Sequence, residues 1–181
     1  MKTYRLLWKI QRKNKKKELE RPAAEPGKEV EMEPILDACC GSKMFWYDKD
    51  NPFVIFMDNR EENDILCDGR KLIVKPDIVA DFKNMPFPDN TYGLVVFDPP
   101  HLISAGADSW LAKKYGVLPK EWKPYLKAGF DECMRVLKPG GVLVFKWNED
   151  QIKTAEVLKV FERQPLFGDR RSKTRWTFFM K

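Results

Sequence analysis

The stretch "LVVFDPPH", Leu94 to His101, organises the predicted fold. Its first four residues are apolar, and a short continuous apolar run of this kind is typical of a buried parallel strand. Pro99 and Pro100 cannot continue a strand ladder, because neither has a backbone N–H to donate. The carboxylate of Asp98 is therefore expected at the carboxyl end of a strand, which is the edge where open α/β sheets bind ligands.

The residues at this strand end are suited to holding a planar amino group. Asp98 provides an acid, Pro99 a rigidly held carbonyl, and His101 a flat ring. Taken alone, the same residues fit an ordinary loop equally well, with Asp98 as a turn residue and His101 exposed to solvent. The rest of the chain favours the first interpretation.

Length and composition indicate a globular domain with a polyanionic partner. The chain has 181 residues and a net charge of +6, and 43% of its residues are hydrophobic. No apolar run has the length of a membrane span, and no apolar segment of a signal peptide follows the basic N-terminus. Four cysteines, including the adjacent pair Cys39 and Cys40, lack the spacing of a zinc site. We expect a cytoplasmic protein without a metal or a membrane association, and its oligomeric state stays open.

The N-terminal part of the chain differs in composition from the remainder. Residues 11–17 form a basic block, which is typical of a solvated arm and equally of a contact to a phosphate backbone. Residues 21–34 are rich in Pro and Glu and poor in apolar side chains, as in a linker. We therefore expect residues 1–32 to be an arm and linker, and residues 33–181 to be the folded domain.

Two further strands are each predicted to end in an aspartate. In "ILDACCG", Ile35 to Gly41, Asp37 follows the apolar residues, Gly41 permits a tight turn, and a helix is expected over 43–47. In "FVIFMDNR" the strand 53–57 ends at Asp58, which lies 58 − 37 = 21 residues after Asp37. A carboxylate that binds ribose hydroxyls lies about 20 residues after the first motif of a nucleotide-binding fold. The alternative is that Asp58 only caps a turn with Asn59.

The remaining segments complete an α/β pattern. A third short strand over 77–82 carries Asp81 and Phe82 at its tip, and 61–76 is expected to contain a polar loop and a short strand. The segment 102–125 is either a lid over the sheet edge or a helical insertion that packs its tryptophans inward. A helix before Pro139 would bury Phe130, Cys133, Met134 and Leu137 on one face. After it we expect a strand over 142–148, a helix over 150–162, and two strands around 164–167 and 176–180.

With these motifs assembled, residues 33–181 resemble a class I S-adenosylmethionine-dependent methyltransferase. "ILDACCG" is similar to the first motif of that family, "DNR" to its ribose-binding acid, and "ADFKNMPFPD" to its adenine-contacting segment. "DPPH" resembles the signature of enzymes that methylate exocyclic amino groups of nucleic-acid bases, as in small phage-type DNA methyltransferases. Two departures are that the first motif lacks the family's glycine spacing, and that His101 replaces a more usual Tyr, Phe or Trp.

The resemblance implies a Rossmann-like, doubly wound, mainly parallel sheet with a C-terminal antiparallel strand pair. It also implies methyl transfer from S-adenosyl-L-methionine to a base amino group, with adenine in DNA favoured over cytosine or RNA. A small-molecule methyltransferase and a binding module without turnover are the alternatives. The residues it assigns to catalysis are Asp98, Pro99, Pro100 and His101, with Trp110 or Trp147 as further candidates to hold the face of the base. Those it assigns to the cofactor are Asp37, Cys39, Gly41, Asp58, Asp81 and Phe82.

Overall fold

The computed structural model describes residues 33–106, 109–169 and 172–181. The predicted arm and linker, residues 1–32, lie outside the described residues, so their role stays a prediction. The helices and strands are β1 (Ile35–Asp37), β2 (Val54–Asp58), β3 (Glu62–Ile65), β4 (Lys71–Val74), β5 (Ile78–Val79), β6 (Tyr92–Phe97), α2 (Trp110–Tyr115), α3 (Trp122–Val136), β7 (Leu137–Asn148), α4 (Thr154–Phe161), β8 (Phe167–Gly168) and β9 (Thr174–Met180). Every helix in the described ranges is too short or too polar to cross a membrane.

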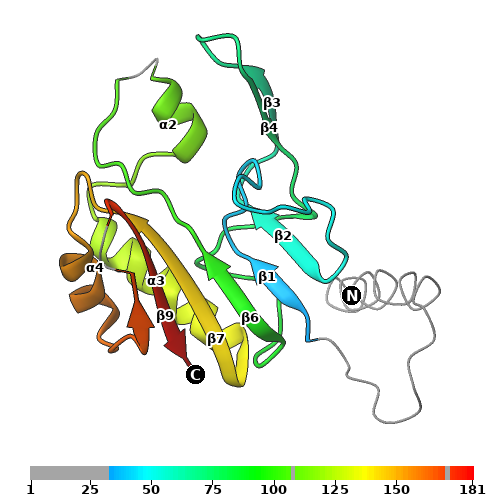
Figure 1. Cartoon of the computed structure of the whole chain (residues 1–181), viewed down its shortest axis with the longest axis vertical. Coiled ribbons are helices and arrows are strands. Elements are labelled where there is room, and N and C mark those ends of the chain that lie inside the picture. The colour runs from blue at the N-terminus through cyan, green and yellow to red at the C-terminus, as the bar shows by residue number, and fades with distance from the viewer. Residues whose placement is uncertain (1–32, 107–108, 170–171) are drawn as a thin grey trace.

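The main sheet has the predicted Rossmann-like architecture (Figure 1). Its strand order is β5-β2-β1-β6-β7-β9-β8, and the first five of these strands are parallel. β9 runs antiparallel to both β7 and β8, which confirms the C-terminal antiparallel pair. The strand that contains Leu94–Phe97 lies in the middle of the sheet, between β1 and β7, and Val95 and Phe97 are fully buried.

Helices α3 and α4 pack on one face of the sheet and bury most of the apolar core there (Figure 1). Phe130 of α3 stacks on Phe161 of α4, with 4.2 Å between ring centroids. At Gly129 the helix passes so close to the sheet that a Cβ atom would lie 2.5 Å from Phe82 and 2.8 Å from Phe97. A glycine here lets α3 approach the strand that carries Asp98.

A hairpin and a short helix project from the sheet at its carboxyl edge (Figure 1). The segment expected to hold a loop and one strand forms the antiparallel pair β3–β4, with Gly69 in its turn at a φ of 81°. Trp110 of α2 packs on the apolar cluster of Leu66, Leu72 and Val74. The segment after His101 is therefore a helical insertion in which Trp110 packs inward, and its residues Tyr115, Gly116 and Tyr125 also lie at the carboxyl edge, as expected of a segment that contacts the site.

The prediction of a helix at residues 43–47 is wrong. The structure has turns there, because Gly41 and Lys43 adopt left-handed backbone angles, with φ of 47° and 54°, that an α-helix cannot continue. Trp46 is held instead by the sheet, since its indole N–H donates to Asp37 and its ring packs edge-on against Phe56.

Several predicted boundaries also shift. The helix α3 begins at Trp122 and ends at Val136, so Leu137 is the first residue of β7. The predicted turn at Pro139-Gly140-Gly141 is present as an irregularity within β7, because the pairing with β6 jumps from Leu137 to Val142 and Gly140 has a φ of 78°. The strand over 77–82 is reduced to Ile78–Val79, because this edge strand pairs only with the last two residues of β2. The last helix begins at Thr154 rather than at residue 150.

Candidate active site

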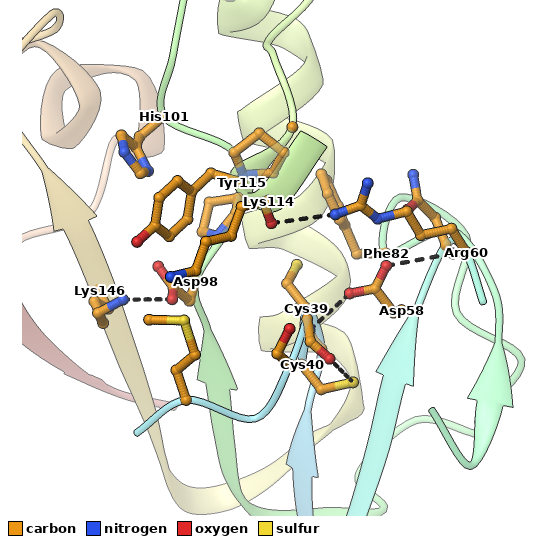
Figure 2. Close-up of a pocket in the computed structure, with 18 of the residues that line it drawn as sticks. Cys39, Cys40, Asp58, Arg60, Phe82, Asp98, His101, Lys114, Tyr115 and Lys146 are labelled. Carbon is orange, nitrogen blue, oxygen red and sulfur yellow. Dashed lines mark hydrogen bonds and ion pairs between the residues drawn. The ribbon is translucent and has the colours of Figure 1, made fainter. Parts of the chain in front are cut away.

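A pocket of about 230 Å³ lies at the carboxyl edge of the sheet (Figure 2). Its walls come from the segments that follow β1, β2 and β6, from the end of α2, and from α3 and β7. The structure thus brings segments far apart in the sequence together at the predicted edge. The lining residues that the sequence had singled out are Cys39, Gly41, Asp58, Phe82, Asp98, Pro99, Pro100 and His101.

Asp98 directly follows the last residue of β6 and pairs with a lysine of the neighbouring strand. Its Oδ2 accepts a hydrogen bond from Nζ of Lys146, at 2.5 Å, and the two side chains are only 20% and 21% exposed. Burial raises the pKa of Asp98 above its ordinary value, while the ammonium group of Lys146 opposes that shift. The site therefore holds a poorly solvated carboxylate whose charge depends on its immediate neighbours.

Two contacts fix the loop after Asp98. The backbone N–H groups of Ile103 and Ser104 both donate to Oε1 of Gln151, at 2.5 Å and 3.1 Å, and the amide of Gln151 donates back to the carbonyl of Ser104 at 3.0 Å. On the other side, Gly116 lies against the ring of Pro100 at a φ of 74°, where an ideal Cβ would come within 3.1 Å of the ring. The chain after Asp98 is thus held from the loop between β7 and α4 and from the residue that follows α2.

His101 lies beside aromatic rings at the pocket wall (Figure 2). Its ring centroid is 5.4 Å from that of Tyr115 and 6.3 Å from that of Trp147. Burial, together with the positive charge of Lys146, lowers the pKa of His101 below its ordinary value. The imidazole is therefore neutral at physiological pH, as a ring that stacks on a ligand requires.

Asp58 closes the opposite part of the pocket. Its Oδ2 accepts the backbone N–H of Gly41 at 2.8 Å, and its Oδ1 accepts that of Arg60 at 3.3 Å. Burial raises the pKa of Asp58, although these hydrogen bonds and the charge of Arg60 work against the shift. The tips of β1 and β2 are thereby joined through a carboxylate at the pocket wall.

Asp37 and Asp81 do not line the pocket. Asp37 is fully buried beneath it, where its carboxylate accepts hydrogen bonds from Trp46 Nε1 at 2.7 Å and from the backbone of Cys39 at 3.2 Å. Burial, opposed by these hydrogen bonds and assisted by the charges of Asp98 and Asp58, raises the pKa of Asp37 to about 7. Asp81 is exposed and pairs with Lys83 at 3.4 Å. Their predicted cofactor roles stay predictions.

The two tryptophans considered as stacking partners lie elsewhere. Trp147 has no exposed surface, and its indole N–H donates to the carbonyl of Ile152 at 2.9 Å. Trp110 packs on the hairpin and has Arg70 over its ring at 4.6 Å. Neither ring lines the pocket, because Trp147 is buried in the core and Trp110 is packed against the β3–β4 hairpin.

Sequence reasoning did not assign Lys146, Tyr115 and Tyr125 to the site, yet all three line it. The alternation in β7 contained a signal for Lys146, because a strand that buries Phe145 and Trp147 must turn the residue between them to its other face. Both tyrosines belong to the segment 102–125, for which a position over the sheet edge was one of the two interpretations, but nothing in the local sequence distinguishes them from its other aromatic residues. No group of three or more potential metal-ligating side chains occurs within the described ranges.

No family model matches the chain, and no curated protein sequence matches it. Among solved structures, it is similar to the PH0226 protein of Pyrococcus horikoshii OT3, with 12% identity, a TM-score of 0.55, and coverage of 98% of this chain and 91% of that one. Two others are PH0851 (14% identity, TM-score 0.48, 82% and 42% covered) and the antibiotic-resistance methyltransferase Kmr (14%, 0.42, 81% and 85%). The similarity to PH0226 indicates a shared fold and nothing further.

Proposed function

We propose that this protein transfers a methyl group from S-adenosylmethionine to an exocyclic amino group of a nucleic-acid base, with adenine in DNA as the favoured target. The observation that carries the proposal is the position of Asp98. It is a desolvated carboxylate at the end of a central strand, followed by Pro99 and Pro100, in the same pocket as Asp58 and Gly41.

The charges in and beneath the pocket fit the methyl donor. Asp58 and Asp98 in the pocket and Asp37 beneath it all have raised pKa values, and the charges of Asp58 and Asp98 contribute to the shift at Asp37. Such a cluster favours a ligand with positive charge, and S-adenosylmethionine carries a sulfonium and an ammonium group. In the proposed arrangement Asp58 accepts hydrogen bonds from the ribose hydroxyls, Phe82 contacts the adenine, and the backbone from Cys39 to Gly41 borders the methionine part.

The strand end after β6 is suited to activating a weakly nucleophilic nitrogen. The lone pair of a base amino group is delocalised into the ring, and acceptance of its hydrogens by Asp98 and by the carbonyl of Pro99 localises that lone pair on nitrogen. When bound, S-adenosylmethionine would supply an electrophilic methyl group. Transfer would join the nitrogen to this carbon and release the sulfur as a neutral thioether, and Asp98 would accept the proton that the nitrogen loses. Positioning and fixed electrostatics supply most of the rate.

A base inside a duplex must first leave the stack to reach this pocket. His101, neutral and adjacent to Tyr115, is placed to contact the face of such a base. The net charge of +6 and the basic block at residues 11–17 support a nucleic-acid partner, although that block lies outside the described residues.

The proposal is tested by transfer of tritiated methyl from S-adenosylmethionine to DNA, RNA and a panel of metabolites. We expect label in DNA, in a base amino group, and background counts with Asp98→Ala. Asp131→Ala is the matched control, because Asp131 is an exposed carboxylate on α3 outside the pocket. Label only in a metabolite would instead indicate a small-molecule methyltransferase, and donor binding without any transfer would indicate a binding module.

A further inference from the structure

Lys146 is the one cation that contacts Asp98 among the residues the structure describes. It lies in β7 between Phe145 and Trp147, which are both fully buried on the helix-covered face, so its side chain points to the opposite face of the sheet. The aromatic rings of Phe45 and Trp176 flank its ammonium group, with their centroids 5.3 Å and 5.8 Å from Nζ. The ammonium group is therefore held in a defined position at the pocket wall (Figure 2).

The pair has unused hydrogen-bonding capacity on both partners. A lysine ammonium group has three N–H donors, and within the described part of the chain Nζ of Lys146 has one oxygen partner, Oδ2 of Asp98. In the same part of the chain, Oδ1 of Asp98 has no hydrogen-bond donor. Because the bonded atoms are 2.5 Å apart, the pocket presents an acceptor and a donor side by side.

We propose that Lys146 is a specificity-determining residue that donates to the ring nitrogen next to the amino group bound by Asp98. This inference rests on the proposed function and names its substrate class more narrowly. Adenine and cytosine both have an amino donor beside a ring-nitrogen acceptor on their Watson–Crick edge, which matches the carboxylate and ammonium of the pair. On its Watson–Crick edge, guanine has an N–H donor beside the amino group, so it does not match the pair when that edge is presented. An aliphatic amine has no ring nitrogen and is rejected.

A purely structural role for Lys146 makes a different prediction. If the ammonium group only compensates the buried charge of Asp98, its removal weakens binding of all substrates equally. If it reads the ring nitrogen, its removal abolishes discrimination between a base with that nitrogen and one without it. The ratio of two substrates measured with the same variant separates these roles, because any change in the charge of Asp98 cancels in that ratio.

The experiment uses single-stranded oligonucleotides with one target base, either adenine, 1-deazaadenine or 7-deazaadenine. Dissociation constants are measured by fluorescence anisotropy, and kcat/KM by methyl transfer, with 3-deazacytosine as the analogue if cytosine is the methylated base. The wild-type protein should bind and methylate adenine at least about tenfold better than 1-deazaadenine, as expected for loss of one hydrogen bond to a charged group. 7-Deazaadenine, which lacks a nitrogen remote from that edge, should behave like adenine.

The variant Lys146→Met keeps the length of the side chain between Phe45 and Trp176 and should reduce the adenine preference to about one. Lys146→Arg, which keeps charge and N–H donors, should retain a preference, and Lys120→Met is the control at an exposed lysine outside the pocket. Equal treatment of adenine and 1-deazaadenine by the wild-type protein overturns the proposal without any variant. A preference that survives in Lys146→Met also overturns it, whereas failure to methylate any nucleic acid overturns the proposed function itself.

Discussion

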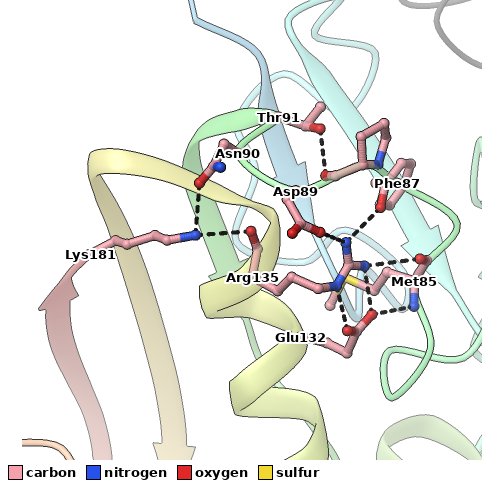
Figure 3. Close-up of polar contacts among 9 residues, drawn as sticks. Met85, Phe87, Asp89, Asn90, Thr91, Glu132, Arg135 and Lys181 are labelled. Carbon is pink, nitrogen blue, oxygen red and sulfur yellow. Dashed lines mark hydrogen bonds and ion pairs between the residues drawn. The ribbon is translucent and has the colours of Figure 1, made fainter.

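The two edges of the sheet use the same kinds of charged side chain for opposite purposes. At the amino edge, the guanidinium group of Arg135 donates to Glu132 at 2.6 Å and 2.8 Å, to Asp89 at 2.7 Å, and to the carbonyls of Phe87 and Met85 (Figure 3). These contacts lower the pKa of Glu132 below its ordinary value. The charges at this edge stabilise one another and join α3 to the segment before β6.

At the carboxyl edge, three buried aspartates are destabilised in their charged form. Burial raises the pKa values of Asp37, Asp58 and Asp98, and Lys146, the one cation that contacts Asp98 in the described part of the chain, compensates only part of the cost. A folded protein retains buried charges of this kind where a ligand completes their environment. The difference indicates that the amino edge serves stability and that the carboxyl edge serves binding, and each prediction below tests one side of it.

The largest expected effect is that of Asp98→Ala on methyl transfer. Removal of one preorganised electrostatic partner typically lowers kcat by a factor on the order of 10²–10³. KM should change little. The free energy of unfolding reflects two opposing effects, because the variant removes a buried carboxylate and leaves the ammonium group of Lys146 without its partner. Steady-state kinetics beside chemical denaturation measure both quantities, and a normal kcat would remove Asp98 from the mechanism.

Next in size is the pH dependence caused by Asp37. Its pKa of about 7 in the folded protein exceeds the unfolded value of 3.8, so between these values the folded state holds a proton that the unfolded state has lost. Stability should therefore fall as pH rises through this window, by up to roughly 1.4 kcal/mol per pH unit for this group. In Asp37→Asn the slope should be less steep than in the wild-type protein in denaturation curves taken at pH 4.5 to 7.5, and an unchanged slope would assign it to other groups.

Asp58→Ala should weaken binding of S-adenosylmethionine at least tenfold. A charge-assisted hydrogen bond to a ribose hydroxyl contributes on the order of 1.5–3 kcal/mol. Isothermal titration calorimetry of the variant and of Asp131→Ala gives the comparison. An affinity equal to that of the wild-type protein would place the ribose elsewhere.

The smallest effect should come from the amino edge and should be confined to stability. Glu132 accepts hydrogen bonds from Arg135 and from the backbone of Met85 at 2.7 Å, so Glu132→Ala should lower the free energy of unfolding by about 1–2 kcal/mol. Since its folded pKa is depressed, this contribution is present above the unfolded value and is lost as pH falls through the folded pKa. The kcat of this variant should match the wild-type value. A lower kcat would contradict the assignment of the amino edge to stability alone.

The sequence predicted the part of the site that depends on strand ends. Continuous apolar runs identified β2 and β6. Asp58 is the last residue of β2 and Asp98 directly follows β6, so the geometry of a parallel sheet places both at its carboxyl edge. The gathering of Asp58, Gly41 and Asp98 in one pocket follows from that topology. Local pattern and sheet geometry sufficed here, because each residue is placed by its own strand.

The features that were missed depend on contacts between distant residues. Asp98 and Lys146 are 48 residues apart, and only the parallel pairing of β6 with β7 brings them together. The helix expected at 43–47 failed because the left-handed angles at Gly41 and Lys43, not propensity, determine that turn. At the α3–β7 junction, Leu137 was expected on the helix but pairs with Tyr92 of β6, while Pro139-Gly140-Gly141 forms the predicted turn before regular pairing starts at Val142.

The central claim is that Asp58 and Asp98 in the pocket at the carboxyl edge await a cationic ligand, whereas Glu132 at the amino edge is already paired with Arg135. The most direct test is a pH titration of the carboxyl carbons by ¹³C NMR, with and without S-adenosylmethionine. We predict that Asp58 and Asp98 titrate above the ordinary aspartate value in the free protein and shift downward when the ligand is added, while Glu132 stays below its ordinary value in both states. Ordinary pKa values at Asp58 and Asp98, or raised values that the ligand leaves unchanged, would contradict the account.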